Sequence, residues 1–214
     1  MRIVADENMP LVEALFGTLG EVVRLPGRSM TSADVRDADA LLVRSVTRVT
    51  RELLEGSRVR FVGTATIGTD HIDLPAMAAL GVAVVSAPGC NARAVAEYVL
   101  TCLALLAEEQ GWQPSGRSVG VVGLGNVGRH VVSLLQAAGF RVAGCDPFVD
   151  EEAMPGLPRM SLDDMIEHCD ILLLHTPLTR SGPHPTFHLL DEKRLARLRS
   201  GQILLNAGRG EVVD

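Results

Sequence analysis

Aromatic residues are scarce in this sequence, making up 3% of its 214 residues, although hydrophobic residues make up 47%. Valine, leucine and alanine therefore carry the apolar content, which is typical of parallel sheets covered by helices. There are only four cysteines, and none of them form a Cys-x-x-Cys pair. We therefore expect reduced thiols, no disulfide and no metal site.

The sequence also lacks long runs of positive charge or of apolar residues. No cluster of lysine and arginine accompanies the formal net charge of -6, which argues against nucleic acid or an anionic membrane as a partner. The longest apolar stretches, such as residues 98–107, are far shorter than a membrane span. The first residues contain no apolar signal region and include Asp6, so we expect a cytoplasmic protein.

What the chain does contain is a regular alternation of short apolar runs and helical patterns. The runs have the length of buried parallel strands, and they lie at residues 3–5, 22–25, 40–43, 61–64, 82–86, 119–122, 142–145, 171–174 and 203–205. The helical patterns lie at residues 10–18, 74–80, 91–109, 127–138, 162–168 and 192–198. This alternation predicts an α/β protein with two doubly wound parallel-sheet domains.

A domain boundary is expected near the longest predicted helix, residues 91–109, for which Asn91 is the expected N-cap. A loop rich in glycine and proline follows this helix, and a new strand begins at Ser118. We therefore predict one domain over residues 1–97 and a second over residues 98–214.

A glycine motif of the form G-x-G-x-x-G occupies residues 123–128, between a predicted strand and a predicted helix. The pattern is weak by itself, but this strand-turn-helix context is that of the dinucleotide-binding fingerprint. Gly123 would allow the tight turn, and Gly125 would let the backbone approach a pyrophosphate. Gly128 would let the helix pack closely on the strand.

Asp146 ends the next predicted strand, where this fingerprint places an acidic residue. Its carboxylate would accept hydrogen bonds from the adenosine ribose and repel a 2′-phosphate, so the sequence favours NAD over NADP. The alternative is a glycine turn that binds no ligand, and the combination of strand, helix and acid argues against it. We expect NADH to bind roughly tenfold or more tightly than NADPH.

Several further motifs occur in order along the chain. They are residues 41–47, residues 63–73, Cys145-Asp146-Pro147, Leu174-His175-Thr176-Pro177-Leu178-Thr179 and Leu205-Asn206-Ala207-Gly208-Arg209-Gly210. Together with the glycine motif, they resemble the D-isomer-specific 2-hydroxyacid dehydrogenases over essentially the whole chain. The resemblance implies a flavodoxin-like substrate domain followed by an NAD-binding Rossmann domain that is incomplete at its C-terminus.

The resemblance also implies roles for individual side chains. Arg209 corresponds to the catalytic arginine, whose guanidinium would hold the substrate carboxylate and the C2 oxygen, although a solvated arginine in a turn is the alternative. Ser45 and Thr66 correspond to substrate contacts, but either could simply cap a strand end. Arg44 is a candidate phosphate partner or an ordinary surface arginine. The implied cofactor contacts are Gly123, Gly125, Asn126, Val127, Gly128, Asp146, Thr176 and Ala207.

The family mechanism also requires a histidine that takes the hydroxyl proton and a glutamate that orients it. Both follow the arginine motif in the family, whereas this chain ends at Asp214, so we expect neither to be present. His175 belongs to a strand end, and His71 is expected to order the substrate loop. We also expect the chain alone to be unstable and nearly inactive, because the absent part would leave a sheet edge and helix faces exposed.

Within the family, the opening residues 5–8, the loop at 66–71 and an insert at 182–186 favour oxidation of 4-phospho-D-erythronate. This implies NAD as cofactor, a phosphorylated hydroxy acid as substrate, and a homodimer that serves pyridoxal phosphate (vitamin B6) synthesis. Another D-2-hydroxyacid, such as 3-phosphoglycerate, is the alternative substrate. A module that senses NADH without turnover is an alternative of a different class, because fold alone does not fix function.

Overall fold

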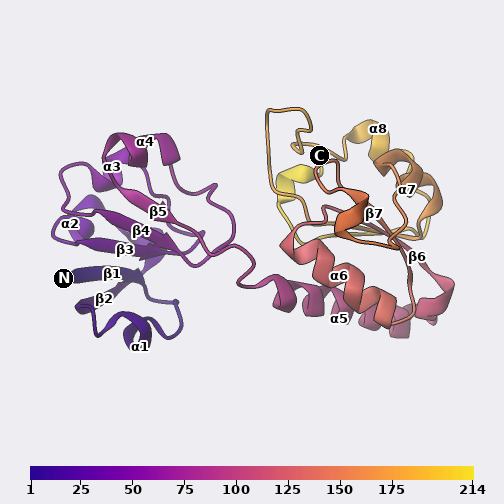
Figure 1. The fold of residues 1–214 in the computed structure, drawn as a ribbon, viewed down its shortest axis with the longest axis horizontal. Helices are drawn as coiled ribbons and strands as arrows, with labels where there is room; N and C mark the ends of the chain where they lie inside the picture. Colours follow the sequence, from indigo (N-terminus) through magenta and orange to yellow (C-terminus); the bar gives the residue numbers. More distant parts are fainter. The chain divides into compact units, whose positions relative to one another are not determined.

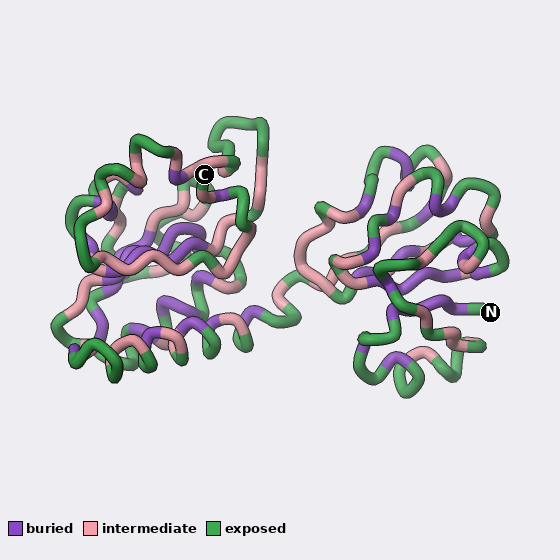
Figure 2. Tube along the Cα trace, turned by 180° about the vertical axis from the view of Figure 1, so that it is seen from behind, coloured by how far each residue is buried: buried purple, intermediate pink, exposed green.

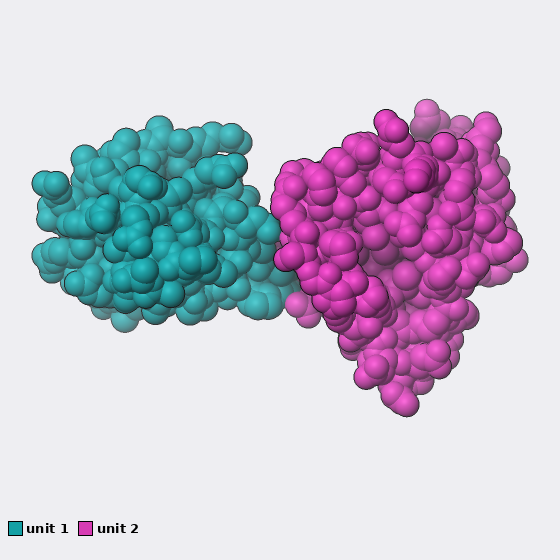
Figure 3. Space-filling model, turned by 90° about the horizontal axis from the view of Figure 1, so that it is seen from above, with its two compact units in different colours: residues 1–90 teal, residues 91–214 magenta.

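The strands expected from the apolar runs are all present, and they form two separate parallel sheets. The structure, a computed structural model, describes all of residues 1–214. The chain divides into two units, Met1–Cys90 and Asn91–Asp214 (Figure 3). The predicted α/β class with two parallel sheets is therefore confirmed.

The first unit contains a five-stranded sheet in the order β2-β1-β3-β4-β5, with every pair parallel (Figure 1). This is the flavodoxin-like order. Its strands are β1 (Arg2–Asp6), β2 (Glu21–Leu25), β3 (Ala40–Val43), β4 (Phe61–Thr64) and β5 (Ala83–Val85). Its helices are α1 (Val12–Phe16), α2 (Ser32–Val35), α3 (Arg51–Leu54) and α4 (Leu74–Ala79).

Alternate residues along the central strands of this sheet belong to different cores. Val4 and Leu41 pack into the core beneath α2, α3 and α4, whereas Ile3 and Leu42 pack beside Val12 of α1. The strands are therefore buried on both faces, which explains why they read as unbroken apolar runs in the sequence (Figure 2).

The second unit contains a four-stranded parallel sheet in the order β7-β6-β8-β9. Its strands are β6 (Ser118–Val122), β7 (Arg141–Cys145), β8 (Ile171–Leu174) and β9 (Ile203–Asn206). Its helices are α5 (Ala92–Gln110), α6 (Asn126–Ala137), α7 (Leu162–His168) and α8 (Glu192–Leu195). The sheet separates a core beneath α5 and α6 from a core beneath α7.

The division between the units falls at the start of α5, whereas the boundary expected after residue 97 lies inside this helix. The whole helix belongs to the second unit because Ala96, Val99 and Leu103 pack into its core. Asn91 holds the expected N-cap position, but its side chain makes no capping hydrogen bond.

Two short helices were absent from the sequence-based prediction. Both α2 and α3 have four residues, which is too short to show a helical repeat. Their caps are nevertheless local: Thr31 and Asp34 form a capping box on α2, and the side chain of Thr50 accepts a hydrogen bond from the N–H of Leu53. Helices predicted at 10–18 and 192–198 are shorter than expected, at Val12–Phe16 and Glu192–Leu195.

The four cysteines are all free thiols in the structure. They range from exposed Cys90 to buried Cys169. No helix combines the length and the apolar character that crossing a membrane requires.

Candidate functional site

A cleft of about 730 Å³ lies at the carboxyl ends of β6, β7 and β8 in the second unit. The chain runs from β6 to β7 on one side and then crosses to β8 on the other, so the cleft lies where the strand order reverses. Open parallel sheets bind ligands at such a switch point. Four residues implicated by the sequence line this cleft, namely Gly123, Gly125, Asp146 and Thr176.

The three glycines of the motif have different surroundings. Gly123 has a φ of +92°, and a Cβ there would lie 2.8 Å from the carbonyl carbon of His175. A Cβ on Gly128 would lie 1.9 Å from the carbonyl oxygen of Gly123. A Cβ on Gly125 would meet nothing within 4 Å. The backbone itself therefore requires two of the glycines, while Gly125 borders open space in the cleft.

Helix α6 begins at this loop, with Gly125 as its N-cap. Asn126, Val127 and Gly128 form its first turn, and N–H groups in the first turn of a helix have no partner within that helix. None of these three residues is among those that line the cleft. Their contribution to an anion site would come from backbone N–H groups and the helix dipole.

Asp146, which follows β7, is bonded to the backbone through both carboxylate oxygens. Its Oδ2 accepts a hydrogen bond of 2.8 Å from the N–H of Leu124, and its Oδ1 accepts one of 2.9 Å from the N–H of Phe148. The Nε of Arg129 donates to the carbonyl oxygen of Leu124 at 3.0 Å. Each oxygen of Asp146 retains a second lone pair, so the carboxylate can still accept from a ligand hydroxyl.

Unpartnered polar atoms lie where β8 ends. Both ring nitrogens of His175 and the Oγ1 of Thr176 are buried without a hydrogen bond, and both residues line the cleft. Burial lowers the pKa of His175 to about 4, so its ring is neutral at pH 7. Buried polar groups without partners are unusual in folded proteins, and a ligand in the cleft would be able to satisfy these atoms.

Sequence reasoning missed one wall of the cleft, which the segment 179–186 forms. Thr179 and Thr186 brace this segment, each N–H donating to the other residue's Oγ1 at 2.8 and 3.1 Å. The ring of His184 meets that of Phe148 edge-on, with centroids 5.3 Å apart. The insert at 182–186 was recognisable as a motif, but no local signal showed that it lines the same cleft as Asp146.

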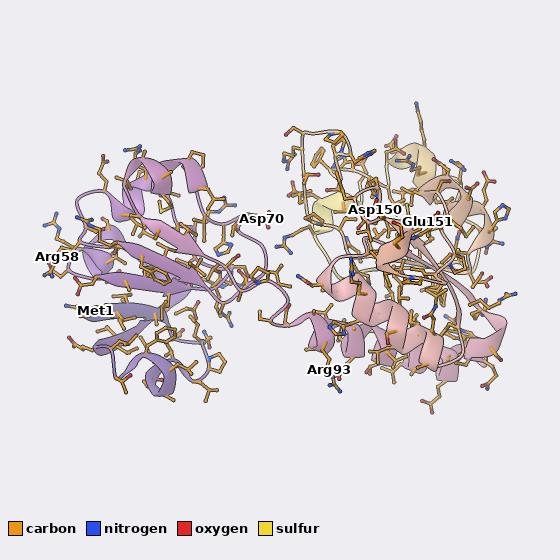
Figure 4. The ribbon with its side chains drawn as sticks, in the orientation of Figure 1. Met1, Arg58, Asp70, Arg93, Asp150 and Glu151 are labelled. Carbon is orange, nitrogen blue, oxygen red and sulfur yellow. The ribbon has the colours of Figure 1, made fainter.

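Two further parts of the cleft also escaped the sequence analysis. Asp150 and Glu151, labelled in Figure 4, line the cleft in the turn after β7. Arg159 reaches the cleft through an isolated bridge to Gly144, and its Nη2 donates to the carbonyl oxygen of Asp150 at 2.9 Å. The Nε and Nη1 of Arg159 are buried without partners. No pattern near Arg159 in the sequence indicates this placement.

The loop after β9 carries Ala207 and Arg209. Asn206 clamps this loop, because its Oδ1 accepts from the N–H of Gly208 at 3.0 Å and its Nδ2 donates to the carbonyl oxygen of Arg209 at 2.8 Å. A Cβ on Gly208 would lie 3.0 Å from the carbonyl oxygen of Thr176, so the loop runs beside the end of β8. Neither Ala207 nor Arg209 lines the cleft, and Arg209 is half-buried.

The three candidate substrate residues of the first unit lie at one edge of its sheet. Val43 of β3 pairs with Thr64 of β4, so Arg44 and Ser45 emerge at the same edge as Thr66. Ser45 is exposed.

Arg44 has a neighbour that its position in the sequence does not reveal. Its Nε lies 3.6 Å from the Oδ2 of Asp6, whose side chain is 0% exposed at the end of β1. Arg44 is therefore partly exposed and lies beside a buried carboxylate. Asp6 also accepts a hydrogen bond of 2.8 Å from the N–H of Asn8, but its Oδ2 has no hydrogen-bond partner.

Comparison with known protein families gives one match over the second unit. Residues 104–214 match the model of the D-isomer specific 2-hydroxyacid dehydrogenase, NAD binding domain.

Comparison with curated sequences gives relatives along the whole chain. The erythronate-4-phosphate dehydrogenase of Pseudomonas syringae pv. syringae (strain B728a) is 56% identical over 100% of this chain and 56% of its own length. That of Azotobacter vinelandii (strain DJ / ATCC BAA-1303) is 55% identical over 100% of this chain and 56% of its own length. The chain thus spans little more than half the length of these relatives.

Solved structures share the fold of the whole chain. The TT0316 protein from Thermus thermophilus matches with a TM-score of 0.85 and 26% identity, over 100% of this chain and 76% of its own. The D-lactate dehydrogenase from Aquifex aeolicus, complexed with NAD and lactic acid, matches with a TM-score of 0.84 and 23% identity. That match covers 100% of this chain and 71% of the solved one, and at this identity it shows the fold alone.

Proposed function

The chain belongs to the D-isomer specific 2-hydroxyacid dehydrogenase family, and we propose that it is part of an enzyme that oxidises 4-phospho-D-erythronate with NAD. The observation that carries the proposal is the cleft of the second unit, where the glycine loop, Asp146 and the unpartnered atoms of His175 and Thr176 converge. The choice of substrate is supported by relatives at 55–56% identity that are named erythronate-4-phosphate dehydrogenase.

The residues of the cleft fit a dinucleotide. Open space beside Gly125 admits a pyrophosphate, and the first turn of α6 offers N–H groups to it. Asp146 keeps lone pairs for ribose hydroxyls and would repel a 2′-phosphate. The Oγ1 of Thr176 is available to the same ligand. NAD bound there would supply the acceptor for the hydride that leaves C2 of the substrate.

Other residues of the chain would bind and orient the substrate. We assign the carboxylate and the C2 oxygen to the guanidinium of Arg209, because its forked donors match a pair of oxygens. Ser45 and Thr66 are assigned to the substrate chain and Arg44 to its phosphate, since all three emerge at one sheet edge. Asp6 would hold the Nε of Arg44 and leave the outer part of this 37%-exposed side chain available.

The proton of the C2 hydroxyl needs a base, and His175 is unsuited to that role. Its pKa of about 4, lowered by burial, makes it a weak base at neutral pH. We therefore do not assign proton transfer to His175.

The family resemblance also suggests an oligomeric state, a cellular location and a pathway for the complete protein. We propose a cytoplasmic homodimer that takes a phosphorylated hydroxy acid in the synthesis of pyridoxal phosphate. Light scattering of the complete protein would show twice the mass of one chain. A monomer would remove the dimer from the proposal without affecting the reaction.

The reaction is tested by the absorbance of NADH formed by the complete protein from NAD and 4-phospho-D-erythronate. We expect NADH production by the wild type and its loss in Arg209→Ala. NADH production with 3-phosphoglycerate instead would be consistent with the family assignment but would overturn the proposed substrate. NADH binding without oxidation of any D-2-hydroxyacid would overturn the enzymatic role in favour of a sensing module.

A further inference from the structure

Three side chains of the first unit form a continuous chain of hydrogen bonds. The Oγ1 of Thr64, at the end of β4, lies 2.7 Å from the Oγ1 of Thr66 and 3.0 Å from the Nε2 of His71. The Oγ1 of Thr66 donates in turn to the carbonyl oxygen of Gly68 at 2.9 Å. Thr64 is only 4% exposed, so water does not compete for the two hydrogen bonds that its hydroxyl makes. Asp70, labelled in Figure 4, marks the loop that carries His71.

The carbonyl of Gly68 fixes the direction of these bonds. A carbonyl oxygen can only accept, so Thr66 gives its single hydroxyl proton to Gly68. Thr64 must then donate to Thr66, and the oxygen of Thr64 is left to accept from His71. His71 therefore carries a proton on Nε2, because a ring nitrogen without a proton would offer Thr64 no donor.

We infer that the Thr66 hydroxyl can only accept a hydrogen bond from a ligand, and that Thr64 and His71 are positioning residues that keep it an acceptor. The inference rests on the proposed function, which places Thr66 at the substrate. One lone pair of Oγ1 accepts from Thr64, and the second suits a ligand that donates. Carboxylate and ionised phosphate oxygens only accept, so Thr66 selects a substrate hydroxyl.

Turning the Thr66 hydroxyl toward an anion has a cost, because it exchanges the hydrogen bond to Gly68. To donate to an anion, Thr66 would lose its bond to Gly68, whose carbonyl oxygen would then need another donor. The only other acceptor for the proton of buried Thr64 among the hydrogen bonds of the structure is the Nε2 of His71 in its other tautomer, and the 2.7 Å contact between Thr64 and Thr66 would then contain no proton. The substrate class that follows is a hydroxy acid with a second hydroxyl besides the one that is oxidised, as at C3 of 4-phospho-D-erythronate.

The first test of this inference compares two substrates on the complete protein. One is 4-phospho-D-erythronate, and the other is its 3-deoxy analogue, which keeps the carboxylate, the C2 hydroxyl and the phosphate. We expect Thr66→Val to raise KM for the first compound about tenfold, the loss expected for one hydrogen bond, and to leave KM for the analogue within about twofold. Thr66→Ser, which keeps the hydroxyl, should retain the discrimination between the two.

Equal increases in KM for both compounds would overturn the inference, because they would place Thr66 on the carboxylate or the phosphate. His71→Ala and Thr64→Val should each reduce the preference for the hydroxylated compound while kcat changes less than KM. Unchanged preference in both variants would remove their positioning role.

The second test does not depend on activity. Long-range proton–nitrogen NMR spectra of the complete protein should show His71 with its proton on Nε2, and the Nδ1 tautomer would overturn the bond direction. If the wild type oxidises neither compound, the proposed function is wrong, and so is the assignment of a substrate hydroxyl to Thr66. The tautomer of His71 then still decides the direction of the hydrogen bonds.

Discussion

The carboxylate of Asp146 anchors the glycine loop by accepting a hydrogen bond of 2.8 Å from the N–H of Leu124. Its second oxygen accepts from the N–H of Phe148, so the end of β7 is tied both to the loop after β6 and to its own turn. The acid that we propose to contact the ribose therefore also shapes the loop proposed to contact the pyrophosphate.

Changing Asp146 to Asn should weaken NADH binding about tenfold or more. The amide has one acceptor oxygen instead of two, so the N–H of Leu124 or of Phe148 loses its partner. Without the negative charge, and with Arg159 in the same cleft, NADPH should bind at least as well as to the wild type. Fluorescence titration gives both dissociation constants, and Asp150→Asn is the control in the same cleft. An unchanged ratio of NADH to NADPH affinity would contradict the role of Asp146.

Alanine at Gly125 and alanine at Gly128 should affect different properties, NADH affinity in the first case and stability in the second. In Gly128→Ala the new methyl group would lie 1.9 Å from the carbonyl oxygen of Gly123, so we expect a loss of about 1–3 kcal/mol in unfolding free energy. In Gly125→Ala the methyl group meets open space, so stability should stay within about 0.5 kcal/mol while NADH affinity falls. Denaturant unfolding and NADH titration distinguish the two. Wild-type NADH affinity in Gly125→Ala would exclude the close approach of a ligand at this residue.

His175 should make the stability of the protein depend on pH. Burial lowers its pKa from 6.5 to about 4 in the folded state, so the unfolded chain binds this proton more readily. The stabilisation is therefore complete above about pH 6.5 and is lost as the pH falls toward 4. Between pH 7 and pH 5 the wild type should lose about 2 kcal/mol more unfolding free energy than His175→Asn, which does not titrate. Equal losses, measured by denaturant unfolding at both pH values, would show that the ring is not buried as described.

Removing Arg44 should destabilise the first unit more than removing an exposed arginine. Arg44→Ala leaves the fully buried carboxylate of Asp6 without its neighbouring cation, at an expected cost of about 1–3 kcal/mol in unfolding free energy. Arg58→Ala is the matched control, because Arg58 is 68% exposed in its pair with Asp39 and should cost at most about 1 kcal/mol.

The double variant Asp6→Asn/Arg44→Ala should recover part of the loss, because the buried group is then neutral. Denaturant unfolding of the three variants forms the comparison. If Arg44→Ala lowers the unfolding free energy no more than Arg58→Ala does, the pairing of Arg44 with Asp6 does not stabilise the fold.

Much of the fold could be read from the sequence because its signals are local. Strands buried on both faces appear as apolar runs such as residues 171–174, all of which are 0% exposed. The turn at Gly123 and the close contact of Gly128 with it arise within six consecutive residues, so the motif alone indicated them. The four-residue helices α2 and α3 were missed because they are too short for a periodic pattern.

The α/β class, the strands and the glycine loop follow from the amino-acid sequence, because they depend on the conformation and polarity of neighbouring residues. The partners of Asp146, the pairing of Arg44 with buried Asp6, and the burial that lowers the pKa of His175 depend instead on the tertiary fold. It also set the direction of the hydrogen bonds that leave Thr66 an acceptor. These properties arise when the carboxyl ends of separate strands meet in space, and no pattern along the chain encodes which polar atoms then find partners.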